Sequence, residues 1–253
     1  MKESHSNHPD EPLRPGVSFA TTKWTQVVQA QGQTEGAREA LSELCSVYYA
    51  PVEAFIRKRT GRERSRDLTQ AFFARLLEKG GVSSAQPYKG RFRSFLLGAV
   101  KHFLADQKDY ERAAKRGGGE APLSLDAEGR EGVGLEVADE SMTSSEGCYD
   151  RRWAITLLDR GLARVREELE VAGKAEQFEI LKHWLPGSSG IPQAEAIARL
   201  GISEGAFKVA VHRLRKRFRD AVLAEVAATV ESSEQIREEV RYLIEVMARG
   251  HSG

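Results

Sequence analysis

Residues 193–219, QAEAIARLGISEGAFKVAVHRLRKRFR, predict two short helices separated by a tight turn. Gly201 suits the left-handed conformation that ends a helix, and Ser203 is a suitable N-cap for the next one. Beyond the turn, apolar residues recur at steps of four and three and predict one buried stripe, formed by Phe207, Val211, Leu214, Phe218 and Val222. The stretch therefore predicts a helix-turn-helix and sets the expectation of an all-α chain.

The second of these helices also has a basic face. From Arg199 to Arg219 there are seven Lys and Arg residues against one acid, Glu204. Solvated helix faces usually mix both signs, so this excess favours contact with DNA phosphates. A tight turn followed by a helix with one apolar and one basic face is typical of a reader of the major groove. An ordinary helix pair with a solvated basic face is the alternative.

The basic helix divides into base-reading and phosphate-gripping positions. Residues near a helix N-terminus reach deepest into the groove, so we expect base contacts from Ser203, Glu204 and Lys208. Contacts with phosphates are expected farther along the helix, from Arg213, Arg215, Lys216 and Arg219. His212 could contact a phosphate or a base, or stay solvated.

The overall charge of +1 hides two charged blocks of opposite sign. Residues 52–116 carry sixteen Lys and Arg against seven Asp and Glu, whereas residues 117–150 carry nine acids against a single arginine. The basic block is expected to bind a phosphate backbone. The acidic block is rich in Gly and Ser and too poor in large apolar residues to form a core, which predicts a flexible linker.

Composition also limits the cellular setting. Cys45 and Cys148 are far apart and lack the spacing of a disulfide framework or a zinc site, which favours a reducing cytosol. No apolar run suggests a signal peptide or a membrane span. We therefore expect a cytoplasmic chain without membrane attachment, metal or other cofactor.

Helical periodicity without a convincing strand pattern predicts two helical domains joined by the acidic linker. Within the N-terminal domain, we expect two helices between Thr25 and Arg59, with a kink or break at Pro51. The expected segments are a disordered tail (1–18), an N-terminal helical domain (19–116), the linker (117–150), a helix-turn-helix domain (151–230) and a C-terminal helical extension (231–253).

Three motifs follow one another along the chain: Asp67-Leu68-Thr69-Gln70, the run from Arg91 to Asp106, and the run from Gly205 to Arg215. In this order they resemble the motifs of a bacterial sigma factor of the extracytoplasmic-function (ECF) type. Asp67-Leu68-Thr69-Gln70, followed by Phe73 and Leu76, is similar to the polymerase-binding helix of the second sigma region. Arg91-Phe92-Arg93-Ser94-Phe95-Leu96, continuing to Asp106, is similar to its promoter-melting helix. Gly205-Ala206-Phe207-Lys208, continuing to Arg215, is similar to the recognition helix of the fourth sigma region. Ala71 and Phe207 depart from the usual pattern, as does the C-terminal extension.

The resemblance implies an alternative sigma factor that binds core RNA polymerase and directs promoter recognition and DNA opening. It implies polymerase contacts by Asp67, Gln70, Phe73 and Leu76. The helix that begins near Ser203 would read the upstream (minus-35) element as duplex. The melted single strand of the downstream (minus-10) element would be held by Arg91, Arg93, Lys101, His102 and Lys108. The resemblance allows an anti-sigma protein or another regulator as a further partner without identifying one.

Several interpretations stay open beside this one. Phe92, Phe95 and Phe103 are more simply explained as core residues than as DNA contacts. The acidic linker could mimic RNA in the polymerase or serve as a plain spacer, and the helix at 232–249 could pad the C-terminal domain or dock a regulator. The main alternative function is a helix-turn-helix transcriptional regulator with a helical sensing or interaction domain. No catalytic motif indicates an enzyme.

Overall fold

The computed structural model describes residues 23, 24, 27, 33–78, 82, 91–115, 144–185, 191–230 and 232–249. Within these ranges every regular element is a helix, which confirms the predicted all-α class. None of the described helices combines the length and the apolar character needed to cross a membrane. The predicted tail at 1–18 and the predicted linker from 117 to 143 lie outside the described residues.

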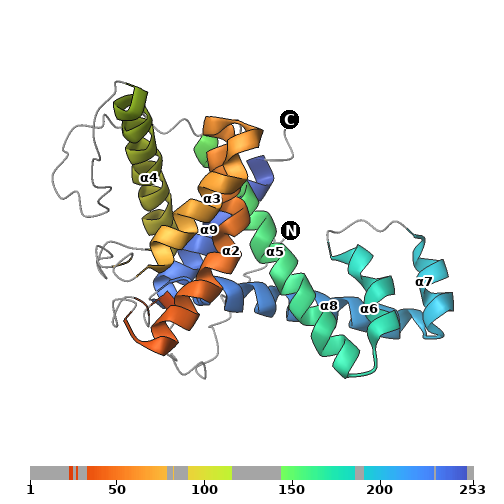
Figure 1. Ribbon diagram of the computed structural model, residues 1–253. Coiled ribbons are helices and arrows are strands. Elements are labelled where there is room, and N and C mark those ends of the chain that lie inside the picture. Colours follow the sequence, from red (N-terminus) through yellow and green to blue (C-terminus); the bar gives the residue numbers. More distant parts are fainter. Residues whose placement is uncertain are drawn as a thin grey trace, which may run out of the picture.

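The N-terminal part is built on α2 (Glu35–Thr60), α3 (Arg62–Leu77) and α4 (Phe92–Lys115), all visible in Figure 1. Helix α2 begins where Thr34 Oγ1 accepts a hydrogen bond from the N–H of Ala37 (3.2 Å). It ends at Gly61, whose φ of 86° favours glycine. The helix continues through Pro51, so of the kink or break expected there, the break does not occur. Packing of α2 against α3 and α5 holds it together across the hydrogen bond that proline removes.

The C-terminal part contains α5 (Ser145–Val171), α6 (Ala175–Leu181), the 3-10 helix η2 (Lys182–Trp184), α7 (Gln193–Leu200), α8 (Glu204–Ala227) and α9 (Ser233–Arg249). Helix α5 begins inside the predicted linker, where Ser144 Oγ accepts a hydrogen bond from the N–H of Gly147 (2.9 Å). Residues 145–150 are therefore helical, and Tyr149 is fully buried. Glu146 and Asp150 made this segment resemble the acidic linker in composition, so it was predicted as part of the linker. An acid in the first turn, such as Glu146, is however favourable at a helix N-terminus.

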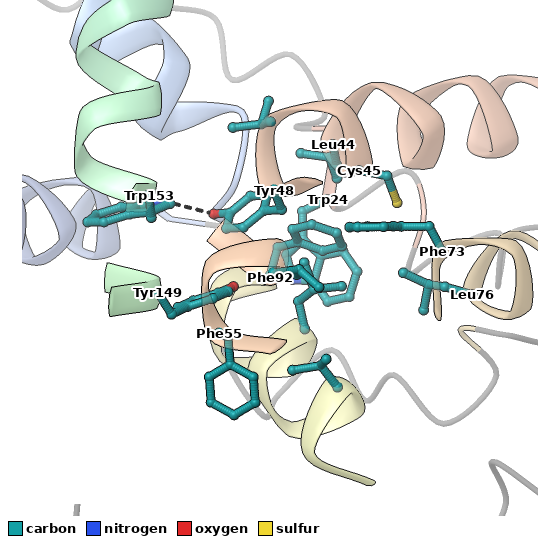
Figure 2. Packing of buried hydrophobic residues seen from close by; sticks show 14 of the residues in the cluster. Trp24, Leu44, Cys45, Tyr48, Phe55, Phe73, Leu76, Phe92, Tyr149 and Trp153 are labelled. Carbon is teal, nitrogen blue, oxygen red and sulfur yellow. Dashed lines mark hydrogen bonds between the residues drawn. The ribbon is translucent and has the colours of Figure 1, made fainter. Parts of the chain in front are cut away.

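A large aromatic core surrounds α2, and Figure 2 shows how its side chains meet. The indole Nε1 of Trp153 on α5 donates a hydrogen bond to the hydroxyl of Tyr48 on α2 (3.2 Å). The ring of Trp24 packs edge-on against Phe92 at the beginning of α4, with centroids 5.0 Å apart. The first half of α5 thus belongs to the same core as the N-terminal helices.

The end of α8 and all of α9 join this first core, which the sequence did not predict. Val222 and Val226 of α8 lie in it beside Leu243 and Val246 of α9. The predicted boundaries at 150/151 and 230/231 therefore do not follow the packing. The apolar stripe of α9 was predicted, but its partner was not, because periodicity identifies a buried face without naming what covers it.

A second, smaller core lies around α6, α7, the end of α5 and the first part of α8. Figure 1 shows α5 and α8 extending from the bundle toward α6 and α7. The two long helices approach closely at Gly161, where a Cβ atom would lie 2.6 Å from Cγ2 of Val222. Two packed helices, α5 and α8, therefore connect the two cores, whereas the helices on either side of the predicted linker, α4 and the first half of α5, both belong to the first core.

Candidate nucleic-acid interface

The turn between α7 and α8 has the local geometry that the sequence predicts. Gly201 follows α7 with φ 62° and ψ 31°, in the left-handed region. Ser203 is extended, and its Oγ accepts a hydrogen bond from the N–H of Ala206 (3.2 Å) at the beginning of α8. Both local predictions are confirmed, and the first turn of α8 is held open to solvent with its polar residues outward.

The apolar stripe of α8 fixes the rotation of this helix. Phe207, Val211 and Leu214 are buried in the second core, and the ring of Phe207 meets that of Trp184 edge-on, with centroids 5.2 Å apart. Phe218 is half-buried between the two cores, and Val222 lies in the first. Because this stripe faces inward, the basic residues between its members face solvent.

All eight residues selected on this helix are exposed: Ser203, Glu204, Lys208, His212, Arg213, Arg215, Lys216 and Arg219. Lys208 Nζ lies 2.7 Å from Glu204 Oε1, one helical turn away. Hydrogen bonding from Lys208, together with its positive charge, lowers the pKa of the Glu204 carboxyl. Both side chains are exposed, so solvent screens this pair and it is weak.

Arg215 differs from the other basic residues of α8. Its Nε and Nη2 atoms both donate hydrogen bonds to the carbonyl of Trp184, at 3.0 and 2.8 Å. This bidentate contact ties α8 to the end of η2 and gives Arg215 a structural role. By contrast, His212, Arg213 and Lys216 make no hydrogen bond or ion pair within the described ranges, so their polar groups are available.

A groove of about 340 Å³ continues the basic surface along the side of α8. It lies between α8 and the turn from α5 to α6, and its wall combines apolar side chains with Lys174, Arg213 and Arg217. Val209, 47% exposed, lies on its α8 side. Arg217 was not selected from the sequence, although it follows Arg213 by one helical turn within the same basic run. The cationic surface therefore extends beyond the predicted set.

The two arginines predicted at the beginning of α4 both pair with acids of α9, and Arg93 is turned inward. Arg93 is only 11% exposed, and its Nη1 donates to Asp150 Oδ1 of α5 at 2.7 Å. Its guanidinium also donates to Glu239 Oε2 of α9 at 3.3 Å and lies over the rings of Trp153 and Tyr242. Burial alone would lower the pKa of the Arg93 guanidinium, but the carboxylates of Glu239 and Asp150 outweigh burial and raise it. Arg93 is thus a charged member of the core.

Of the other candidates on α4, one forms an ion pair with α5 and two are exposed without a partner in the described ranges. Lys101 Nζ lies 2.9 Å from Glu146 Oε1, near the beginning of α5. His102 and Lys108 are exposed and form no hydrogen bond or ion pair with the described part of the chain. Phe92 and Phe103 are buried, which confirms the core interpretation of these two rings. Of the five residues predicted at this helix, Lys108 is therefore an exposed lysine without an acidic partner in the described ranges.

The four candidates for polymerase contact on α3 are also divided. Asp67 and Gln70 are exposed. Phe73 and Leu76 are 6% and 1% exposed and lie in the first core, where they are not available to a partner. The sequence reasoning missed Leu77, 43% exposed, although it follows Gln70 at a spacing that places both on one face. The open face of α3 is thus mainly polar with one apolar side chain.

Comparisons with known proteins give no relative for this chain. No protein-family model matches it, and neither the curated proteins nor the solved structures contain a significant match. The interface on α8 is therefore defined by its own residues: a capped first turn, a buried apolar stripe and an exposed cationic face.

Proposed function

We propose that this chain is an alternative sigma factor of the ECF type, which binds core RNA polymerase and directs it to promoters. In this proposal α8 inserts its N-terminal half into the major groove of the upstream (minus-35) element. Helix α4 holds the melted strand of the downstream (minus-10) element. Helix α3 provides part of the contact with the polymerase.

The observation that carries the proposal is the arrangement of α7 and α8. The left-handed turn at Gly201 and the cap at Ser203 present the beginning of α8 to solvent, with its apolar stripe buried. Lys208 is exposed about one turn into α8, where base contact is expected, and Arg219 is exposed three turns farther on, where phosphate contact is expected. This is the geometry that a major-groove reader requires.

Two further surfaces support the proposal. Asp67, Gln70 and Leu77 lie on one exposed face of α3, as a docking helix needs. Lys108 on α4 is exposed and has no acidic partner among the described residues, and positively charged grooves hold single strands through their phosphates. A protein that reads only duplex DNA has no need of this second cationic helix.

The test is reconstitution with core RNA polymerase. The purified chain is expected to elute with core enzyme in size-exclusion chromatography and to support transcription from a supercoiled promoter library. Gln70→Ala should weaken co-elution, whereas Lys208→Ala should leave co-elution intact and reduce transcription from the selected promoters. A chain that never associates with core enzyme would refute the proposal.

A regulator with a helical sensing domain is the second candidate. One observation favours it: α5 and α8 pass through both cores, so a ligand or partner bound at the first core could reposition α8. Such a regulator would bind a specific duplex tightly by itself and would not require polymerase. Measuring duplex affinity with and without core enzyme separates the two functions.

A further inference from the structure

Acidic residues of α9 form ion pairs with the two arginines at the beginning of α4. Arg91 pairs with Glu238 and also with Glu239, whose Oε1 lies 2.8 Å from Arg91 Nη1. Arg93 shares Glu239 and adds Asp150 of α5. These are the two arginines that the resemblance assigns to the melted strand, and α9 neutralises both.

Arg91 and Arg93 differ in how far their side chains are buried. The side chain of Arg91 is 25% exposed and that of Glu238 is 57% exposed, so this pair can open by side-chain rotation. Arg93 and Glu239 are 11% and 1% exposed, so Arg93 becomes accessible only when α9 itself moves away.

Apolar and aromatic contacts keep α9 in place. Leu243 and Val246 are buried in the first core. The ring of Tyr242 lies 6.1 Å from that of Trp153, and its hydroxyl donates a hydrogen bond to Asp150 Oδ2 (2.6 Å). The acids of α9 are thus presented to the arginines by a packed helix rather than by a loose chain end.

A carboxylate and a phosphate compete for the same guanidinium. Both accept charge-assisted hydrogen bonds from the planar donors of arginine in similar geometry. Arg93 already directs its donors to Glu239 and Asp150, and Arg91 directs its donors to Glu238 and Glu239. A nucleic-acid backbone can reach these groups only by displacing the acids.

We propose that α9 is an autoinhibitory cover, whose acids must release Arg91 and Arg93 before the beginning of α4 can bind a single-stranded backbone. The inference rests on the proposed function, because it assumes that α4 binds the melted strand. Release occurs in two stages, first at the exposed pair of Arg91 and Glu238 and then by undocking of the helix.

The test measures the affinity of the full chain for a fluorescein-labelled, mixed-sequence single-stranded oligonucleotide at several salt concentrations. Glu238→Gln removes one competing acid and leaves the core untouched. Glu234→Gln is the matched control, because Glu234 is an exposed acid of α9 that forms no ion pair within the described residues. Both variants change the net charge equally.

Glu238→Gln leaves Arg91 with Glu239 as its remaining acidic partner, so a phosphate then competes with one carboxylate instead of two. A full phosphate contact by Arg91 would steepen the logarithmic salt dependence by about 0.7 and raise affinity about fourfold at roughly 0.15 M salt, which sets the upper limit of the gain. This gain is expected for Glu238→Gln and not for Glu234→Gln. Adding Arg91→Ala to Glu238→Gln should abolish it. Val246→Ala loosens α9 without changing any charge, and it should raise affinity further while accelerating amide exchange in α9.

Two results would overturn the inference. One is equal affinity and equal salt dependence for Glu238→Gln and Glu234→Gln, in a chain that still associates with core polymerase. The other is an equal loss on Arg91→Ala in the wild-type and Glu238→Gln backgrounds, which would mean that Arg91 is never covered. If the chain and all variants fail to bind both the strand and the polymerase, the proposed function fails as well.

Discussion

Replacing Arg93 by methionine tests whether this guanidinium holds α4, α5 and α9 together. The substitution keeps most of the side-chain volume but removes the charge that faces Glu239 and Asp150. Breaking a buried ion pair costs about 3–5 kcal/mol, because the remaining charge stays buried without compensation. Glu239 keeps Arg91 at 2.8 Å and Asp150 keeps the hydroxyl of Tyr242. These contacts place the expected loss at the lower end, about 3 kcal/mol.

The free energy of unfolding is measured by urea denaturation, followed by circular dichroism at neutral pH. Arg64→Met is the control, because both side chains of its pair with Glu111 are exposed and such surface pairs are worth about 1 kcal/mol or less. Arg93→Lys should recover little of the loss, since an ammonium cannot reproduce the planar contacts with two carboxylates and two rings. Equal losses for Arg93→Met and Arg64→Met would refute the assignment of Arg93 as a buried anchor.

Three further predictions concern other parts of the molecule. Lys208→Ala should weaken binding to the preferred upstream sequence selectively, by about 1–3 kcal/mol. Arg219→Ala should weaken binding to all sequences alike and flatten its salt dependence. Equal effects of the two variants in binding titrations would contradict the placement of α8. Gly161→Ala inserts a methyl group against α8 and should lower the free energy of unfolding, measured in urea, by up to about 2 kcal/mol, because the cost of overpacking exceeds the gain in helix propensity. Gly98→Ala is the control: its added methyl group meets open space, so it should be neutral or stabilising. Burial raises the pKa of the Cys45 thiol to about 12. Between about pH 9 and 12 the unfolded chain therefore releases a proton that the folded chain keeps, so the free energy of unfolding falls as pH rises. Cys45→Ala should remove about 1 kcal/mol per pH unit from that slope above pH 9, and an unchanged slope would exclude this cause.

The sequence predicted the helical class and the local geometry of its most informative segment. The conformation of Gly201, the cap at Ser203 and the buried stripe beginning at Phe207 all depend on residues close together in the chain. Backbone conformation and helical periodicity determine such features directly. The same locality explains why all eight candidates on α8 are exposed.

What the sequence did not predict depends on contacts between distant elements. The inward position of Arg93 requires acids 57 and 146 residues away along the chain, at Asp150 and Glu239. Phe73 and Leu76 matched a motif, but the packing of α3 against α2 puts them in the core. A basic residue or an apolar one can serve a partner or the interior equally well, and only the tertiary structure separates these roles.

The sharing of α8 between the two cores couples surfaces that the sequence treats as separate. From Lys208 to Val226 the helix rises about 27 Å at 1.5 Å per residue, and its far end is packed in the first core beside α9. A helix that is rigid over this length transmits a change of orientation from one end to the other. The position of the proposed recognition surface on α8 is therefore set partly by the packing around Val226 and Leu243. If α8 binds DNA as proposed, a substitution there alters binding without contacting DNA, so binding measurements on core variants need a parallel measurement of stability.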